Sequence, residues 1–335
     1  MPRVFQTFSL AIILVLPSLA LGQLIAVKPD SVAVLGGHHQ YLTAVALSPD
    51  GRTLAHADSS GSIQMWDVGS RKELRQFKEP DGWASAIAFS PDGKRLATGG
   101  TKSFCVRTLE TGKEIWTSKA VSGELWSVAW SSDGKLVAAS GMPTRITIRS
   151  AKTGAETISL DPKCDGTTSL VFSHSGKFLA AGTVDSSVLI WETEHWKIVK
   201  LLRGHTKTVT GLAITGDDKR LVSGSKDLTV KVWSLETAKE LSSINIGQRT
   251  KDAPFPSRAL AVSGNGHLLA KAFSDGVVEF WDLDKRRGPL RLQAHTEFIP
   301  SMVMTPDGQM LITVAQDGTA KLWNVSKLLP EEWHK

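Results

Sequence analysis

The chain has 335 residues, of which 41% are hydrophobic, 21% are charged and 7% are aromatic. This is the composition of a globular protein, and it excludes a disordered, collagen-like or coiled-coil chain. Two cysteines are too few for a disulfide scaffold, and a net charge of +6 does not by itself indicate a nucleic-acid partner.

Residues 1–22 have the pattern of a secretory signal peptide. Arg3 provides a positive start, residues 10–16 form an apolar run, and the small residues Ala20 and Gly22 precede a cleavage point. The apolar run is shorter than the ~20 residues that a membrane-spanning helix needs. We therefore expect cleavage after Gly22, no stable membrane insertion, and export to the periplasm or the extracellular space.

Two sequence markers show that the rest of the chain repeats. The segment at residues 48–51 recurs at spacings of 41, 42 or 48 residues. The second marker is a column that consists of Trp66, Arg107, Arg149, Trp191, Trp233, Trp281 and Trp323. Its spacings match those of the first marker, except that the spacings of 42 and 41 exchange order across the first three repeats. Two markers that move together, even across one shared six-residue insertion, indicate seven repeats.

Each repeat contains short segments with the period of a β-strand. In the first repeat, residues 44–47 lead to a Pro-Asp-Gly turn, and residues 53–55 and 63–66 follow. Asp-Gly between short apolar runs is a hairpin signal, and a fourth β-segment follows each second marker. Such a four-stranded antiparallel sheet is apolar on both faces and must pack between two copies of itself. The pattern predicts an all-β, seven-bladed β-propeller.

At these columns the repeats resemble the WD-repeat family, whose marks are a Gly-His pair, a hairpin Asp and a Trp-Asp pair. The resemblance covers about residues 31–328. It implies that a His, a Ser or Thr, the Asp and the Trp form a buried hydrogen-bonded tetrad within a blade. Two repeats hold all four: His205, Ser223, Asp227 and Trp233, and then His295, Thr313, Asp317 and Trp323.

The other repeats depart from the family pattern. Arg107 and Arg149 replace the Trp in repeats two and three, which also lack the His. Lys163 stands at the His column of repeat four, and Ser60 replaces the Asp of repeat one. We expect repeats two and three to be less rigid, with the fold retained because their apolar columns persist.

The last repeat supplies only three strands before Val325. Residues 31–35 belong to no repeat of their own, so we expect them to form the outer strand of the last blade and close the ring. The predicted organisation is a signal peptide over residues 1–22, a propeller over 23–328 and a C-terminal tail over 329–335.

The sequence predicts no catalytic, cofactor or metal site. His205, Ser223 and Asp227 have the residue types of a catalytic triad, but they fall on repeat columns and recur in another repeat, which indicates a structural role. The sequence contains neither a metal-ligand spacing pattern nor a Gly-rich phosphate loop before a helix. Cys105 and Cys164 fall in repeats that are not adjacent, so we expect free thiols.

The loops that lead into each repeat open onto one face of the propeller. They carry aromatic residues, and the insertion between Ile246 and Arg258 adds basic ones. Loops on a rigid frame often carry function, and aromatic and Arg side chains anchor interfaces. The predicted partner-binding residues are Tyr41, Trp83, Trp126, Arg249, Lys251, Phe255, Arg258 and Phe298. The competing interpretation is that these aromatic side chains only plug the ends of the blades.

These features predict an exported, non-catalytic scaffold of the WD-repeat type, a monomeric propeller that binds a protein or peptide with acidic character. Export together with this repeat pattern suggests a bacterial envelope protein. The alternative is a propeller enzyme, a hydrolase or lyase with titratable side chains converging at the channel mouth. A third interpretation is a lipid-surface or polysaccharide binder that uses Lys285, Arg286 and Arg287. One short basic cluster does not indicate a nucleic-acid partner.

Overall fold

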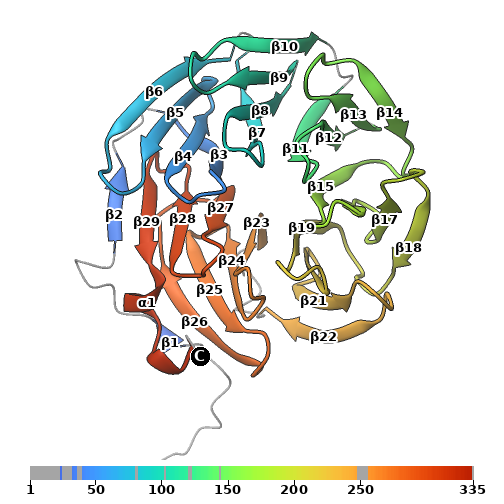
Figure 1. Cartoon of the computed structure of the whole chain (residues 1–335). Helices are drawn as coiled ribbons and strands as arrows, with labels where there is room; N and C mark the ends of the chain where they lie inside the picture. Colours follow the sequence, from blue (N-terminus) through green and yellow to red (C-terminus); the bar gives the residue numbers. More distant parts are fainter. Residues whose placement is uncertain are drawn as a thin grey trace, which may run out of the picture.

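The computed structural model describes residues 23–24, 32–35, 40–79, 82–101, 103–119, 123–142, 145–246 and 256–333. These residues form seven β-sheets arranged as a ring (Figure 1). The predicted all-β, seven-bladed propeller is confirmed. We number its blades one to seven in chain order. The predicted signal peptide, residues 1–22, lies outside the described ranges.

In blades one to six the chain runs from an inner to an outer strand, and consecutive strands of a blade pair antiparallel. The strands of blades one and two are β3 (Leu42–Leu47), β4 (Thr53–Asp58), β5 (Ser62–Asp67), β6 (Glu73–Lys78), β7 (Ala84–Phe89), β8 (Arg95–Gly100), β9 (Ser103–Thr108) and β10 (Glu114–Lys119). Those of blades three and four are β11 (Glu124–Trp130), β12 (Leu136–Met142), β13 (Ile146–Ser150), β14 (Glu156–Leu160), β15 (Thr167–Phe172), β16 (Phe178–Thr183), β17 (Val188–Glu192) and β18 (Ile198–Leu202).

The strands of blades five and six are β19 (Val209–Ile214), β20 (Arg220–Ser225), β21 (Thr229–Ser234), β22 (Glu240–Asn245), β23 (Pro256–Val262), β24 (Leu268–Phe273), β25 (Val277–Asp282) and β26 (Arg287–Gln293). Those of blade seven are β27 (Ser301–Met304), β28 (Met310–Val314), β29 (Ala320–Asn324) and the N-terminal β2 (Val32–Leu35).

The N-terminal strand closes the ring, as predicted. β2 pairs antiparallel with β29, with Val32 opposite Trp323 and Leu35 opposite Ala320. Figure 1 shows the two strands side by side although they come from opposite ends of the chain. A further short strand, β1 (Gln23–Leu24), pairs in parallel with β26. The first two strands of the described chain are therefore paired with strands of the last two blades.

The turn after each inner strand explains the first sequence marker. In blade one, the Asp50 carboxylate accepts hydrogen bonds from the Ser48 hydroxyl (2.5 Å) and the Arg52 backbone N–H (3.1 Å). Gly51 lies between them with φ of 71°, a conformation that favours glycine. The same hydroxyl–carboxylate bond recurs as Ser90–Asp92, Ser131–Asp133, Thr215–Asp217 and Thr305–Asp307. Each marker is therefore a turn held by its own residues.

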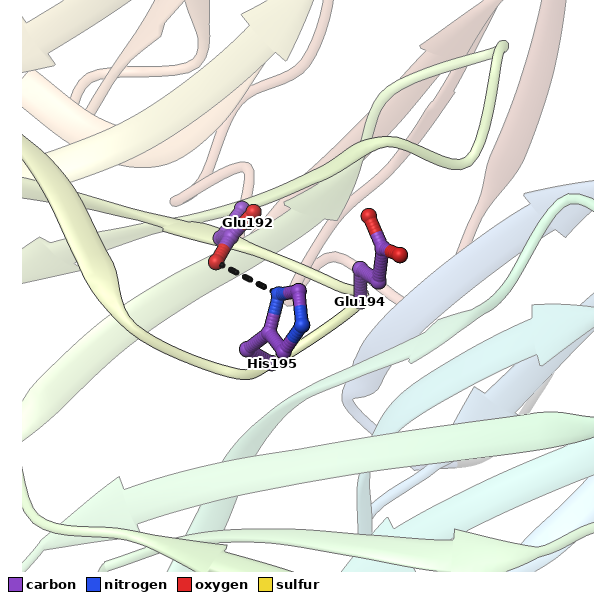
Figure 2. A group of neighbouring side chains, drawn as sticks. All are labelled: Glu192, Glu194 and His195. Atoms are coloured by element: carbon purple, nitrogen blue, oxygen red, sulfur yellow. Dashed lines mark hydrogen bonds and ion pairs between the residues drawn. The ribbon is translucent and has the colours of Figure 1, made fainter.

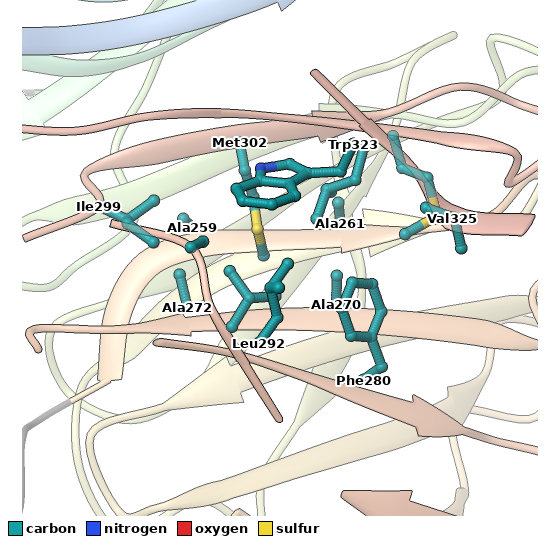
Figure 3. Packing of buried hydrophobic residues seen from close by; sticks show 14 of the residues in the cluster. Ala259, Ala261, Ala270, Ala272, Phe280, Leu292, Ile299, Met302, Trp323 and Val325 are labelled. Atoms are coloured by element: carbon teal, nitrogen blue, oxygen red, sulfur yellow. The ribbon is translucent and has the colours of Figure 1, made fainter. Parts of the chain in front are cut away.

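Large and small apolar side chains pack between neighbouring blades. Figure 3 shows the cluster between blades six and seven, where Trp323 and Met302 lie with Phe280 and Leu292 around small residues such as Ala270. Burying one large apolar side chain contributes about 1.5–3 kcal/mol. Because these contacts cross from blade to blade, each blade is stabilised chiefly by its two neighbours.

The chain ends in two short helical segments, α1 (Val325–Leu328) and η2 (Glu331–Trp333). The Asn324 side chain caps α1 by accepting a hydrogen bond from the Lys327 backbone N–H (3.1 Å). Leu329 is buried in the same cluster as the core of blades six and seven. Across the described ranges, no helix has both the length and the apolar character that a membrane crossing requires.

Candidate functional site

The inner strands of the first five blades share a β-bulge at one repeat column. The pairing register shifts there in β3, β7, β11, β15 and β19. A bulge adds one residue to a strand and redirects its side chain. The bulged residues are Thr43, Ser85, Trp126, Thr168 and Thr210, and the repeat spacing puts Arg258 and Pro300 at the same column in blades six and seven.

Where this column holds a hydroxyl, the hydroxyl bonds backbone carbonyls. The Thr43 hydroxyl lies 3.1 Å from the Ala57 carbonyl in its own blade and 2.5 Å from the Ala84 carbonyl in blade two. Ser85 and Thr168 reach into the next blade in the same way. Thr43, Ser85 and Thr168 therefore tie neighbouring blades together at the channel wall, whereas the Thr210 hydroxyl bonds the Gly224 carbonyl in its own blade.

Trp126 and Arg258 interrupt this pattern and meet each other instead. The guanidinium carbon of Arg258 lies 4.0 Å from the centroid of the Trp126 ring, which is a close cation–π contact. Trp126 comes from β11 in blade three and Arg258 from β23 in blade six. These blades lie across the ring from each other (Figure 1), so the contact spans the central channel.

The contact lies in a cavity of about 490 Å³ at the channel, which the inner strands line. Four predicted partner-binding residues line it: Trp83, Trp126, Arg258 and Phe298. Tyr41 is 60% exposed and lies outside the lining. The structure thus brings four of the predicted residues together. Arg249, Lys251 and Phe255 lie outside the described residues.

Few charged side chains line the described part of the cavity. Among the described lining residues, the charged side chains are Glu124 and Arg258. Arg258 is exposed as a whole residue, but its guanidinium lies over the Trp126 ring. Desolvation there lowers the pKa of Arg258 from its ordinary value, and the negative charge of Glu124 acts in the opposite direction.

Two residues further along the inner strands, the cavity wall becomes apolar. The side chains at this column are Val45, Ile87, Val128, Leu170, Leu212, Leu260 and Met302. A channel enzyme would need several titratable groups converging on one point. The described lining offers one carboxylate and one guanidinium together with hydroxyl groups and an apolar wall.

The predicted tetrad residues are joined by hydrogen bonds inside their blades. In blade five, the Trp233 indole N–H donates to the Ser223 hydroxyl (2.8 Å), which lies 2.7 Å from Nε2 of His205. Nδ1 of His205 lies 2.9 Å from the Asp227 carboxylate. Blade seven repeats this chain with Trp323, Thr313, His295 and Asp317.

Both tetrad histidines are buried, and the desolvation of their rings lowers their pKa values. For His295 the pKa falls to about 4, even though Asp317 acts to raise it. The ring is then neutral near pH 7 and bonds both neighbours. This chain lies inside a blade and away from the channel cavity, so its geometry is that of a structural element.

Blade two has an ionic equivalent of the tetrad, which the sequence pattern missed. Arg107, at the Trp column, forms a 2.5 Å ion pair with Glu79, and both side chains are 4% exposed. Thr98 donates a hydrogen bond to the same carboxylate (3.0 Å) from the column of Ser223. The sequence contained a signal for this pair: an acidic residue just before the blade, Glu79, and an Arg within the blade at the Trp column, Arg107. Arg149 of blade three has no such partner and bonds Glu156, which is exposed.

A small group of potential metal ligands lies on the turn between β17 and β18. Ligand atoms of Glu192, Glu194 and His195 lie within 4.8 Å of one another (Figure 2). Nδ1 of His195 is already 3.2 Å from the Glu192 carboxylate, and both Glu194 and His195 are exposed. This is an ordinary surface turn, and we assign no metal to it.

The two cysteines are both free thiols. Cys105 is buried in blade two beside Arg107, and Cys164 is partly buried before blade four. Burial raises the pKa of both thiols, which disfavours the reactive thiolate. Neither thiol lines the channel cavity.

Comparison with known protein families agrees with this geometry. The WD40 family model, described as "WD domain, G-beta repeat", matches residues 29–67, 71–107, 112–147, 157–192, 196–234 and 289–324, which is more than half of the chain. The chain belongs to the WD40 repeat family. The six matches leave out most of blade six, which nevertheless folds as a WD40 blade between its neighbours.

Individual WD40 relatives resemble only part of the chain. The 66 kDa stress protein of Physarum polycephalum is 33% identical over 117 residues, which are 34% of this chain and 19% of the relative. The small ribosomal subunit protein RACK1 of Candida albicans is 36% identical over 107 residues, 30% of this chain and 33% of the relative. The guanine nucleotide-binding protein subunit beta of Schizosaccharomyces pombe is 29% identical over 85 residues, 25% of this chain and 28% of the relative. The chain thus spans a third or less of each relative.

Proposed function

We propose that this WD40 protein is a non-catalytic scaffold that binds a protein or peptide at the mouth of its channel. The observation that carries this proposal is the convergence of Trp83, Trp126, Phe298 and Arg258 on one cavity. Aromatic and Arg side chains contribute most of the binding energy in many protein interfaces. Trp126 and Arg258 lie on the inner strands β11 and β23, which neighbouring strands and blades hold in place, so these side chains lose little conformational freedom when a partner binds.

The names of two relatives support partner binding. "Small ribosomal subunit protein" and "subunit beta" each describe a component of a larger protein assembly. WD40 propellers as a family bind protein partners. Two exposed rings are available to an extended segment of the partner. Trp83 directly precedes β7 and is 45% exposed, and Tyr41 holds the equivalent position before β3 in the adjacent blade.

The test is selection from a random peptide library displayed on phage, with residues 23–335 as the immobilised target. We expect selected peptides to lose binding when Trp83→Ala and Phe298→Ala are combined. Leu241→Ala is the matched control, because Leu241 is 50% exposed on the outer strand β22. Peptides that bind the double variant as well as the wild type would contradict the proposed face.

We also propose that the protein is exported, as a bacterial envelope protein would be. The support is the composition of residues 1–22, with Arg3 before an apolar run and small residues at the end. The relatives named above are eukaryotic and give no support for export or for a bacterial origin. Mass spectrometry of the protein from its source should find a chain that starts at Gln23, and a chain that retains Met1 would contradict export by cleavage.

A further inference from the structure

We propose that the Trp126–Arg258 pair is a receptor for a carboxylate carried by the partner segment. This inference rests on the proposed function and specifies its ligand: a peptide that presents an acidic group at the channel mouth beside an apolar side chain. It is argued from the repeat columns, from the hydrogen bonding of Arg258 and from the shape of the cavity.

The repeats provide an internal comparison for this pair. At the same column, Thr43, Ser85 and Thr168 bond the backbone of the next blade. Trp126 and Arg258 give up that bond, and each places a large side chain into the channel instead. The two side chains meet across the ring, so the Trp at one position provides the contact surface for the Arg at the other.

Among the described residues, Arg258 makes its contact with the Trp126 ring, and no hydrogen bond occupies its guanidinium N–H groups. A guanidinium that lies over an aromatic ring keeps its N–H groups for acceptors in its own plane, and their fork matches a carboxylate. Within the described part of the chain, the Arg258 guanidinium donates no hydrogen bond and forms no ion pair. Glu124 acts on it through charge alone, from beyond ion-pair distance.

The residues around the pair favour an apolar side chain next to the ligand's carboxylate. Around the pair lie the Trp83 and Phe298 rings, and two residues further in the wall is apolar, for example at Val128. An apolar side chain next to the acid therefore has a place to bind. Glu124 repels an incoming anion, so it weakens the affinity without removing the site.

Three acetylated dipeptides test the inference: Leu-Glu-amide carries only a side-chain carboxylate, Leu-Gln-acid only a terminal one, and Leu-Gln-amide none. Each is titrated into residues 23–335 labelled with 5-fluorotryptophan, and the Trp126 ¹⁹F signal is assigned with Trp126→Phe. We expect this signal to shift with at least one acidic dipeptide and not with the neutral one. Comparison of the two acidic probes shows which source of carboxylate the site prefers.

Variants assign the effect to the pair. Arg258→Gln should weaken binding of the acidic dipeptide roughly tenfold or more. Glu124→Gln should strengthen it, and Arg75→Gln, an exposed control on β6, should leave it unchanged. If Arg258→Gln does not fold, Arg258→Lys replaces it, because Lys keeps the charge but loses the two-pronged geometry and should also bind more weakly.

Three results would overturn the carboxylate receptor. The neutral dipeptide could shift the Trp126 signal as much as the acidic ones, no dipeptide could shift it, or the affinity could survive Arg258→Gln or Arg258→Lys. None of these results would contradict the outcome of the phage selection. If library peptides still require Trp83 and Phe298 while Arg258→Gln has no effect on them, the scaffold function stands and only the carboxylate assignment fails.

Discussion

A buried amine in blade six predicts how the free energy of unfolding depends on pH. Lys271 stands on β24 at the column that holds Ser223 in blade five, and it is 0% exposed. Its amine donates to the backbone carbonyls of Ser257 (2.6 Å) and Ala259 (3.3 Å). The acid opposite it, Glu279, is bound by Arg291 at 2.9 Å. Two carbonyl acceptors satisfy both N–H groups of a neutral amine.

Burial lowers the pKa of Lys271 from 10.5 to about 7. The unfolded chain therefore binds more protons than the folded one between these two values, and the free energy of unfolding rises with pH across that window. Below it, both states are protonated and the penalty is constant. Between about pH 7 and about pH 10, this one group should raise the free energy of unfolding by about 3.5 kcal/mol.

Lys271→Met removes the titrating group while filling a similar volume. Urea unfolding at constant ionic strength should show a steeper rise with pH for the wild type than for the variant. Groups common to both proteins cancel in this difference. If the two rise in parallel, the amine is charged in the folded protein and the reasoning about its burial is wrong.

Three further predictions concern other blades. Arg107→Leu leaves the buried Glu79 carboxylate without its ion pair and should lower the free energy of unfolding by about 3–5 kcal/mol, whereas Arg149→Leu, which loses only a half-exposed pair, should cost much less in the same urea assay. His295 must gain a proton on unfolding in acid, since its folded pKa is about 4; the protein should lose about 3 kcal/mol as the pH falls from about 6.5 to about 4, and an NMR titration of the ring checks this. A chain that starts at residue 36 lacks β2, and it should melt at a lower temperature and associate through the open edge of β29, unlike a chain that starts at residue 31.

Features that depend on neighbouring residues were predictable from the sequence. The number of blades follows from turns such as Ser48–Asp50, which form from their own residues and so leave a mark at each repeat. Ring closure follows from the count of strands in each repeat, because the last repeat lacked one strand and residues 31–35 belonged to no repeat. The positions of the tetrads were predictable for the same reason, since all four side chains lie at fixed columns of one blade.

Features that depend on how distant residues meet were decided by the tertiary structure. The sequence placed Trp126 and Arg258 on the same face of the propeller, but not against each other, because a repeat column gives the blade and the height of a residue and not the direction in which its side chain reaches across the channel. Likewise, the loss of the family tetrad in blade two suggested a weak point, and only the folded chain brings Glu79 to Arg107. Period and turn chemistry act over a few residues, whereas these side chains come together only once the whole ring has closed.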